Sequence, residues 1–255
     1  MSDIYMEAAA EVAKIAGAVA LKYYGKNPEQ RLKSDGSPVS AADIEAERAA
    51  REWIEKRFPD DGIVGEELPS VREGAARRWV LDPIDGTLTF LRAVPFWGTL
   101  VGVTEGDEVL AGAASFPALG ESLAAAPGAG CWHNGTRCSV SSVGDVSQAL
   151  VLTTDARFPG RAERQKCWLR LQVVAKTTRT WGDCYGYLLV ATGRAEVMVD
   201  DVVSAWDAAA LMPIITEAGG VFTDWKGNAT PFGGDAIATN AALADEARKL
   251  LGARS

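Results

Sequence analysis

Arg78-Trp79-Val80-Leu81-Asp82-Pro83-Ile84-Asp85-Gly86-Thr87 is the stretch on which the predictions of fold and site both rest. Its first four residues predict a short buried strand that ends at Asp82. The side chain of Asp82 is therefore expected to project from the edge of a sheet into a crevice. Asp85 follows three residues later, after one turn, so both carboxylates can face the same point.

The end of this stretch is suited to binding an anion. Gly86 lets the backbone approach a ligand closely, and the amide groups of Gly86 and Thr87 can point at that ligand. A helix that began there would favour a negative charge through its dipole. Asp-Pro followed by Asp-Gly is also common turn chemistry, so the stretch by itself is equally compatible with a simple turn.

The overall charge limits what the chain can bind. The 255 residues carry a net charge of -8, and no dense block of lysine and arginine occurs, which argues against nucleic-acid binding. No apolar run reaches membrane-spanning length, and the N-terminus has no basic leader before a long apolar stretch. We therefore expect a cytoplasmic protein without a membrane partner, which needs a local positive charge if it binds a phosphate.

A metal ion would supply that charge. Several ionised carboxylates in a partly buried site repel one another unless a cation lies among them. His133 is the only histidine and is expected at the surface in a turn-like stretch, and the four cysteines are expected to be free thiols. Oxygen ligands without histidine or cysteine favour Mg²⁺ or a similar ion, which would also attract the phosphate.

The rest of the chain predicts layered α and β structure. Helical spacing predicts helices over 3–25 and 41–57, with Ser40 and Asp43 as the capping box of the second. Residues 96–126 predict an antiparallel meander of three strands. The second half predicts strands over 149–153, 196–199, 221–225 and 236–239 and helices over 160–174, 184–192, 206–218 and 241–251. We expect one domain, 1–255, with a metal-binding lobe, 1–140, and a substrate-reading lobe, 141–255.

Three further acids stand beside apolar or glycine-rich sequence. They are Glu66 in Gly65-Glu66-Glu67, Asp43 in the second helix and Asp207 after Trp206. Each has an ordinary explanation of its own: a solvated loop for Glu66, a helix cap for Asp43 and the helix dipole for Asp207. The case for a shared site rests on the occurrence of all these acids in one chain and in this order.

The order and spacing of the motifs resemble the inositol monophosphatase family over nearly the whole chain. The family's motifs are represented by Gly65-Glu66-Glu67, by residues 82–87, by Trp206-Asp207-Ala208-Ala209-Ala210 and by Glu217-Ala218-Gly219-Gly220. The resemblance implies an α/β fold of the layered α-β-α-β-α sandwich type, commonly dimeric. It also implies a Mg²⁺-dependent phosphatase that acts on a small phosphate monoester.

The resemblance further implies which residues would hold the metal. Two to three ions are expected, Mg²⁺ or alternatively Mn²⁺. Glu66, Asp82 and the carbonyl oxygen of Ile84 would hold the first ion. Asp82, Asp85 and Asp207 would hold the second. A third, looser ion would rest on Glu66 and water.

Catalytic and phosphate-binding roles are implied in the same way. Thr87, linked to Asp43, is expected to orient the attacking water and to help deprotonate it, with Glu66 as the third catalytic group. The amides of Gly86 and Thr87 would bind the phosphate. Lys33 matches a lysine that lies near the metals in the family.

The substrate is predicted from the second half of the chain. Residues 179–187, RTWGDCYGY, are similar to the branch of the family that hydrolyses histidinol phosphate. Histidinol phosphate carries an amine and an imidazole, so Asp183 would favour it, as would Asp200, where inositol-cleaving relatives usually have glutamate. Gly182-Asp183 can alternatively act as a cap of the following helix.

Hydrolysis of histidinol phosphate in histidine biosynthesis is the leading prediction. The alternatives within the class are an inositol-1-monophosphatase and a broad sugar-phosphate phosphatase. A rival from another class is a non-catalytic metal- or phosphate-binding regulatory protein that keeps the fold. The complete set of expected metal ligands argues against this rival, because a site that no longer catalyses a reaction should have lost some of them.

Overall fold

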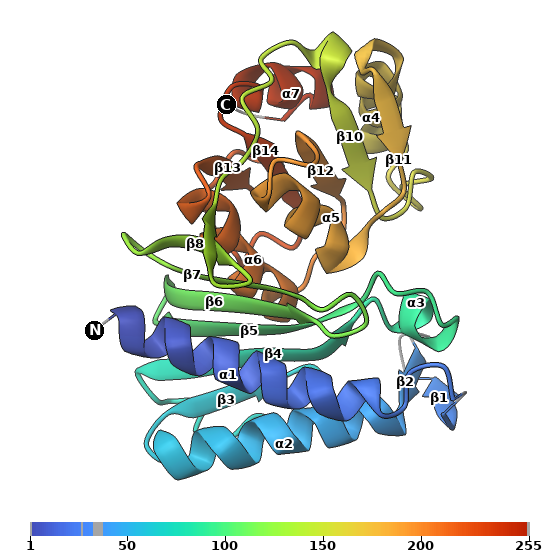
Figure 1. Cartoon of the computed structure of the whole chain (residues 1–255). Coiled ribbons are helices and arrows are strands. Elements are labelled where there is room, and N and C mark those ends of the chain that lie inside the picture. Colours follow the sequence, from blue (N-terminus) through green and yellow to red (C-terminus); the bar gives the residue numbers. More distant parts are fainter. Residues whose placement is uncertain (1, 27, 33–37, 254–255) are drawn as a thin grey trace.

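The structure is a computed structural model that describes residues 2–26, 28–32 and 38–253. Two sheets lie one above the other, with helices outside and between them, so the layers run α-β-α-β-α (Figure 1). The α/β sandwich expected from the sequence is therefore confirmed. Among the described residues no helix has the length and apolarity that a membrane crossing requires.

The first sheet has seven strands in the order β3-β4-β5-β6-β7-β8-β9. Only β3 and β4 run parallel, and the remaining pairs are antiparallel, so β5 to β7 form the expected meander. The strands are β3 (Gly62–Gly65), β4 (Arg77–Asp85), β5 (Gly98–Glu105), β6 (Glu108–Phe116), β7 (Glu121–Ala126), β8 (Gly130–His133) and β9 (Thr136–Cys138).

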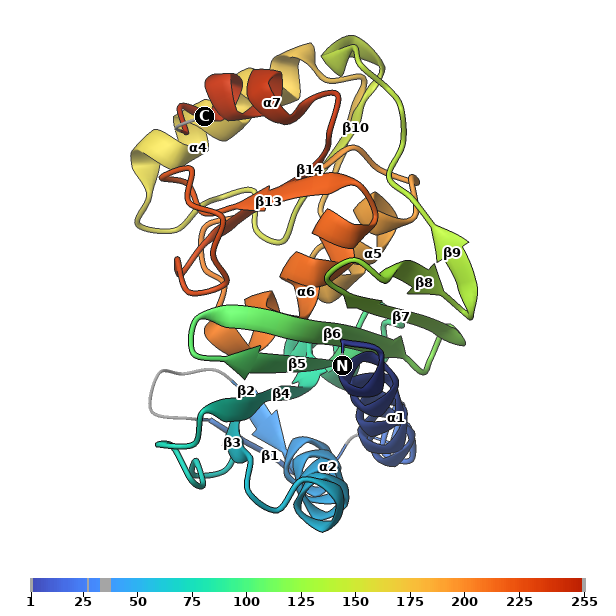
Figure 2. The same cartoon turned by 90° about the vertical axis from the view of Figure 1, so that its left-hand side faces the viewer.

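Helices α1 (Ser2–Leu21) and α2 (Ala41–Arg57) cover one face of this sheet (Figures 1 and 2). Small buried side chains of α1, such as Ala9, Ala13 and Ala16, allow the helix to lie close to the strands. Helix α2 begins at the expected capping box, in which Ser40 and Asp43 bond each other's backbone. A two-stranded ribbon, β1 (Gln30–Leu32) with β2 (Pro38–Ser40), precedes α2.

The second sheet has five strands in the order β11-β10-β12-β14-β13. Helices α5 (Asp183–Ala191) and α6 (Ala205–Glu217) lie between the two sheets, and α4 (Ala162–Val174) and α7 (Ala244–Leu251) cover the outer face (Figure 2). The remaining elements are η1 (Val146–Gln148), β10 (Leu150–Thr153), β11 (Thr177–Arg179), β12 (Val197–Asp200), β13 (Gly220–Thr223), β14 (Ala236–Asn240) and the short α3 (Thr87–Leu91).

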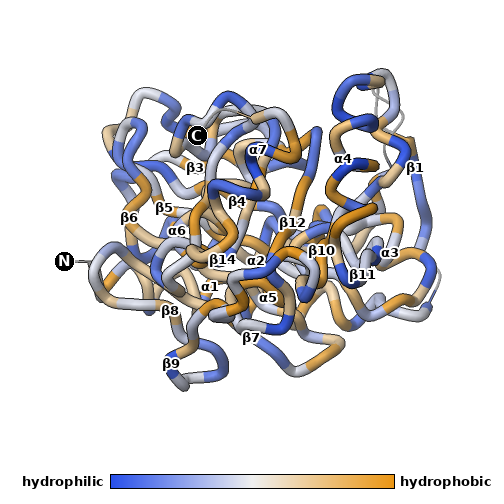
Figure 3. Tube along the Cα trace, turned by 90° about the horizontal axis from the view of Figure 1, so that it is seen from above, coloured by the Kyte–Doolittle hydropathy of each residue, from blue (hydrophilic) through white to orange (hydrophobic). Residues whose placement is uncertain are grey.

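Two glycines of the first sheet set the depth of α6. A Cβ on Gly102 would lie 2.7 Å from the Cβ of Ala209, and one on Gly112 would lie 2.2 Å from the carbonyl oxygen of Ala210. Helix α6 therefore packs against bare backbone, which brings its first turn down to the end of β4. Many of the segments in the interior of the molecule are hydrophobic, and the outer loops are mainly hydrophilic (Figure 3).

The structure corrects the predicted strand ends around the site. Strand β4 does not end at Asp82 but continues to Asp85, and its register with β5 shifts between these two residues. Proline has no N–H group to donate to a neighbouring strand. Pro83 is tolerated there because the shift in register already interrupts the regular hydrogen bonds between β4 and β5. Residues 62–65, for which no strand is predicted, form the parallel strand β3 beside β4.

Two further predictions are wrong in detail. The first helix ends at Leu21, not near residue 25, because residues 22–25 form turns. The turn-like stretch around His133 is a hairpin of β8 and β9, and His133 is only partly exposed, with its Nε2 2.8 Å from Glu121 Oε2. All four cysteines are free thiols, as expected.

Candidate active site

Three carboxylates from two elements converge between the sheets. Asp82 and Asp85 come from the end of β4, and Asp207 comes from the first turn of α6. One oxygen of each lies within 4.8 Å of the oxygens of the others. Asp82 is only 3% exposed, so its charge cannot be dispersed by bulk water.

Backbone N–H groups orient each of these three acids. Ile84 N–H donates to Asp82 Oδ1 at 2.9 Å, and Ser204 N–H donates to Asp207 Oδ2 at 2.9 Å. Cys184 N–H, in the first turn of α5, donates to Asp85 Oδ2. The positive ends of α5 and α6 therefore point toward the cluster, which partly offsets its charge and aims the carboxylates inward.

The electrostatics of the cluster call for a cation. Burial raises the pKa of Asp82 and of Asp85 well above the ordinary value, and neighbouring carboxylates raise both further. Burial also raises the pKa of Asp207 to about 7, although hydrogen bonds from Ser204 and Asp82 oppose this. Because the ligand atoms are all hard oxygens and their charges repel, this set of donors fits a hard divalent ion such as Mg²⁺.

Glu66 lies beside the same cluster. Its backbone N–H donates to the carbonyl oxygen of Leu81 at 3.1 Å, which continues the parallel pairing of β3 with β4 and places it next to Asp82. The charge of Glu66 raises the pKa of Asp82, of Asp43 and of Asp207. Glu66 is therefore close enough to act on all three, although the tight group of three oxygens does not include it.

Thr87 and Asp43 make separate hydrogen bonds in this structure. Thr87 Oγ1 donates to the carbonyl oxygen of Ile84 at 3.1 Å. Asp43 Oδ2 accepts from Ser40 N–H at 2.8 Å and from Ser40 Oγ at 2.6 Å. Asp43 Oδ1 is buried and has no hydrogen-bond partner among the described residues. An unpartnered buried carboxylate oxygen is costly, so this acceptor is available for a hydroxyl group or a water.

Asp183 lies against Gly86, near the end of the stretch 78–87. A Cβ on Gly86 would be 3.0 Å from Asp183 Oδ2, and Thr89 Oγ1 donates to the same oxygen at 3.3 Å. Asp183 has a left-handed backbone (φ 50°), which Asp tolerates better than most residues. Gly86, Thr87 and Asp183 all line one cavity of about 410 Å³, which is large enough for a small phosphate ester.

Asp200 lines a smaller cavity of about 60 Å³ together with Asp183 and Thr154. Its Oδ1 accepts from Thr154 N–H at 3.0 Å, and its Oδ2 accepts from Tyr187 Oη at 3.1 Å. Thr154 Oγ1 in turn accepts from Asp183 N–H at 2.8 Å. Asp200 therefore supports Asp183 through Thr154, a contact that sequence reasoning missed because no local pattern links these residues. Lys33 lies outside the described residues.

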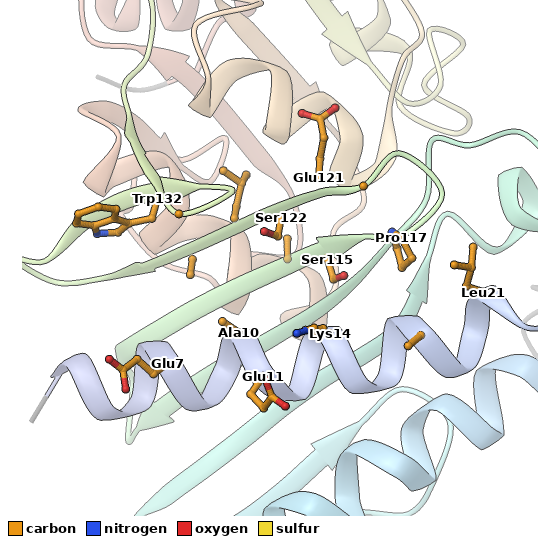
Figure 4. Close-up of a pocket in the computed structure, with 16 residues that line it drawn as sticks. Glu7, Ala10, Glu11, Lys14, Leu21, Ser115, Pro117, Glu121, Ser122 and Trp132 are labelled. Atoms are coloured by element: carbon orange, nitrogen blue, oxygen red, sulfur yellow. The ribbon is translucent and has the colours of Figure 1, made fainter.

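A second hollow lies away from these acids. A groove of about 610 Å³ between α1 and strands β6, β7 and β8 is lined by residues such as Lys14, Pro117 and Trp132 (Figure 4). Its lining contains none of the predicted site residues. Predicted site residues instead line the cavity beside Gly86 and Asp183, and Asp85 and Asp207 line the smaller cavity of about 60 Å³ that also contains Asp183.

Known proteins share both the sequence and the fold. A model of the inositol monophosphatase family matches residues 2–254. A histidinol-phosphatase of Chlorobaculum parvum is 39% identical over 233 residues, covering 91% of this chain and 90% of that protein. The fructose-1,6-bisphosphatase/inositol-1-monophosphatase of Aquifex aeolicus is 32% identical over 250 residues, covering 94% and 92%. The extragenic suppressor protein SuhB of Bartonella henselae superposes with a TM-score of 0.91 at 27% identity, covering 97% and 98%.

The layered fold, the buried carboxylates and these relatives define an enzyme, a phosphoric monoester hydrolase. Within that class the chain belongs to the inositol monophosphatase family, which is metal-dependent. The family resemblance and the enzyme class predicted from the sequence are thereby confirmed.

The metal-free protein is expected to lose stability as the pH rises from 5 to 7.5. The pKa of Asp207 is about 7 in the folded state against an ordinary value of 3.8, and the pKa values of Asp82 and Asp85 are also raised. The folded state then binds more protons than the unfolded state, so the free energy of unfolding falls with pH in this window. Thermal denaturation in a chelator at both pH values measures this as a lower Tm at pH 7.5.

Mg²⁺ should raise the Tm more at pH 7.5 than at pH 5, because the metal binds ionised carboxylates. Asp207→Asn is the matched control, since it removes one of the titrating acids and should flatten the pH dependence. A Tm of the metal-free protein that rises from pH 5 to 7.5 would contradict the raised pKa values of these carboxylates.

Proposed function

We propose that the enzyme hydrolyses histidinol phosphate to histidinol and phosphate with the help of Mg²⁺. The observation that carries this proposal is the position of Asp183, whose carboxylate adjoins Gly86 inside the cavity of about 410 Å³. A carboxylate there would pair with the cationic leaving group of histidinol phosphate, whereas a neutral polyol offers it no charge. The histidinol-phosphatase of Chlorobaculum parvum supports the same assignment.

The proposed metal ligands divide into two sets. Glu66, Asp82 and the carbonyl oxygen of Ile84 would hold one Mg²⁺, and Asp82, Asp85 and Asp207 would hold another. A third, looser ion would rest on Glu66, and Mn²⁺ would be an alternative metal at these oxygens. When bound, the metals would lower the pKa of a water and neutralise charge on the phosphate.

Residues of the chain would supply orientation and proton transfer. Thr87 would hold the attacking water, and it would release the Ile84 carbonyl oxygen that its hydroxyl group now bonds. The unpartnered Oδ1 of Asp43 supports this role, because it could accept the proton of the Thr87 hydroxyl group. The amides of Gly86 and Thr87 would bind the phosphate, since the first N–H groups of α3 have no acceptor within the helix.

Substrate recognition would rest on Asp183, with Asp200 in support. Because both oxygens of Asp200 are already hydrogen-bonded to Thr154 and Tyr187, we propose that Asp200 acts by holding Asp183. We also propose that Lys33 corresponds to the lysine that lies near the metals in the family. The Asp183 side chain would then distinguish this cationic substrate from a neutral one.

Phosphate release from the purified enzyme tests the substrate. With saturating Mg²⁺, kcat/KM is expected to be at least about tenfold higher for L-histidinol phosphate than for inositol 1-phosphate, because one added charge pair is worth more than 1.4 kcal/mol. An equal or opposite preference would support the alternative of an inositol-1-monophosphatase or a broad sugar-phosphate phosphatase. The Aquifex aeolicus relative gives that alternative its support.

We further propose a cytoplasmic homodimer that acts in histidine biosynthesis. The four free cysteines support a reducing compartment, where disulfides are rare. The resemblance to a commonly dimeric family supports the second copy.

A further inference from the structure

We propose that Glu47 and Arg51 of α2 are positioning residues that hold Glu66 in place for metal binding. Glu47 is fully buried, and its Oε1 lies 2.6 Å from Arg51 Nη2 and 2.7 Å from Arg51 Nε. The two side chains stand one helical turn apart and form a buried ion pair. We call this pair the α2 clasp, and it rests on the proposed role of Glu66 as a metal ligand.

The α2 clasp binds the backbone of the loop that follows Glu66. Glu47 Oε2 accepts from Glu67 N–H at 2.9 Å, and Glu47 Oε1 accepts from Leu68 N–H at 3.3 Å. Arg51 donates to the carbonyl oxygens of Leu68 at 2.9 Å and Pro69 at 3.0 Å. Two N–H groups and two carbonyl groups of an irregular loop thus find partners on one helix.

Gly65 lets the same clasp approach the chain on the other side of Glu66. A Cβ at Gly65 would lie 2.1 Å from Glu47 Oε1, so the carboxylate occupies the space that any other residue would need. The N–H of Glu66 itself donates to the carbonyl oxygen of Leu81. Gly65 is held by its pairing with Leu81 in the sheet and Glu67 by Glu47, so the Glu66 backbone between them has little freedom beside Asp82.

The placement of the α2 clasp on the helix explains why it reaches the site. Asp43, Glu47 and Arg51 are spaced by four residues, so they form one stripe along α2. The same helix packs other buried side chains, such as Ala46 and Ile54, in the hydrophobic core. One helix therefore carries both a proposed catalytic acid and the pair that holds a proposed metal ligand.

A buried ion pair gives weak net stabilisation, because desolvation offsets much of the attraction. Apolar side chains could join α2 to the sheet equally well, but they could not bond the backbone of residues 67–69. The geometry therefore points to a role in fixing the position of the loop. Partners of this kind typically change metal affinity by about 10- to 100-fold when they are lost.

The test compares Glu47→Gln and Arg51→Lys with Glu52→Gln, which alters an exposed carboxylate of the same helix. The Mg²⁺ concentration for half-maximal activity is measured with p-nitrophenyl phosphate, and Mn²⁺ binding is measured by calorimetry. Both α2 clasp variants should weaken metal binding about 10- to 100-fold. The kcat at saturating Mg²⁺ should stay within about threefold, and Glu52→Gln should match the unmodified enzyme.

The proposal is overturned if the α2 clasp variants lower the Tm but leave the Mg²⁺ concentration for half-maximal activity and the affinity for Mn²⁺ unchanged. The clasp would then stabilise the fold alone. Glu66→Gln separates this failure from a failure of the proposed metal site. If Glu66→Gln weakens metal binding and the α2 clasp variants do not, only the positioning role is wrong. If Glu66→Gln also has no effect, Glu66 is not a metal ligand and the proposed ligand set fails first.

Discussion

Asp82→Asn is expected to lower kcat at saturating Mg²⁺ by about 10³-fold or more. Asp82 is the acid shared by both proposed metal sites, and it is the most buried of the three that converge. Loss of one shared charged ligand should remove about 4 kcal/mol of transition-state stabilisation, and each 1.36 kcal/mol is a factor of ten. Steady-state phosphate release over a range of Mg²⁺ concentrations gives this value.

The same change should stabilise the metal-free protein. Asparagine keeps an oxygen that can accept from Ile84 N–H, but it removes a buried charge that Glu66, Asp207 and Asp85 repel. For a chain of this size, each kcal/mol of relief raises the Tm by about 2 to 4 °C. Asp107→Asn, in the exposed turn between β5 and β6, is the matched control and should change neither quantity. Normal turnover by Asp82→Asn would show that Asp82 is not a metal ligand.

Asp183→Asn is expected to lower kcat/KM for histidinol phosphate by about 30-fold or more relative to inositol 1-phosphate. Removing one partner of a desolvated charge pair costs at least about 2 kcal/mol, whereas a neutral polyol loses no such pair. Asparagine tolerates the left-handed backbone at this position, and its amide oxygen can still accept from Thr89. The measured quantity is the ratio of the two kcat/KM values, because effects on the nearby metal site then cancel.

Thr89→Val is the companion variant for this experiment. It removes the hydrogen bond to Asp183 Oδ2 but keeps the carboxylate charge, so the ratio should change by only a few-fold. If Asp183→Asn lowers both activities equally, Asp183 acts as the first residue of α5 and not as a substrate acid. The alternative that Gly182-Asp183 serves only the helix would then hold.

Local sequence patterns were sufficient to predict most of the helices and the antiparallel meander of β5 to β7. Helix α2 is predicted within its observed bounds because Ser40 and Asp43 form a capping box that needs no distant partner. Strands β3, β8 and β9 were missed because they are short and their pairing comes from neighbouring strands. The continuation of β4 through Pro83 could not be predicted either. It depends on the pairing with β5, whose register shifts between Asp82 and Asp85.

The sequence alone determined which acids are candidates for binding a metal and in which motifs they stand, because those motifs are local and of recognisable order. Only the tertiary structure decided how they meet. Helix α6 brings Asp207 to Asp82 because Gly102 and Gly112 let it pack on bare backbone.

The same holds for the surroundings of the acids. The fold directs Asp183 against Gly86, encloses Asp200 between Thr154 and Tyr187, and uses Glu47 with Arg51 to hold the loop after Glu66. These contacts join segments far apart in the chain. Their geometry follows from the packing of whole helices and sheets, which no local pattern of residues records.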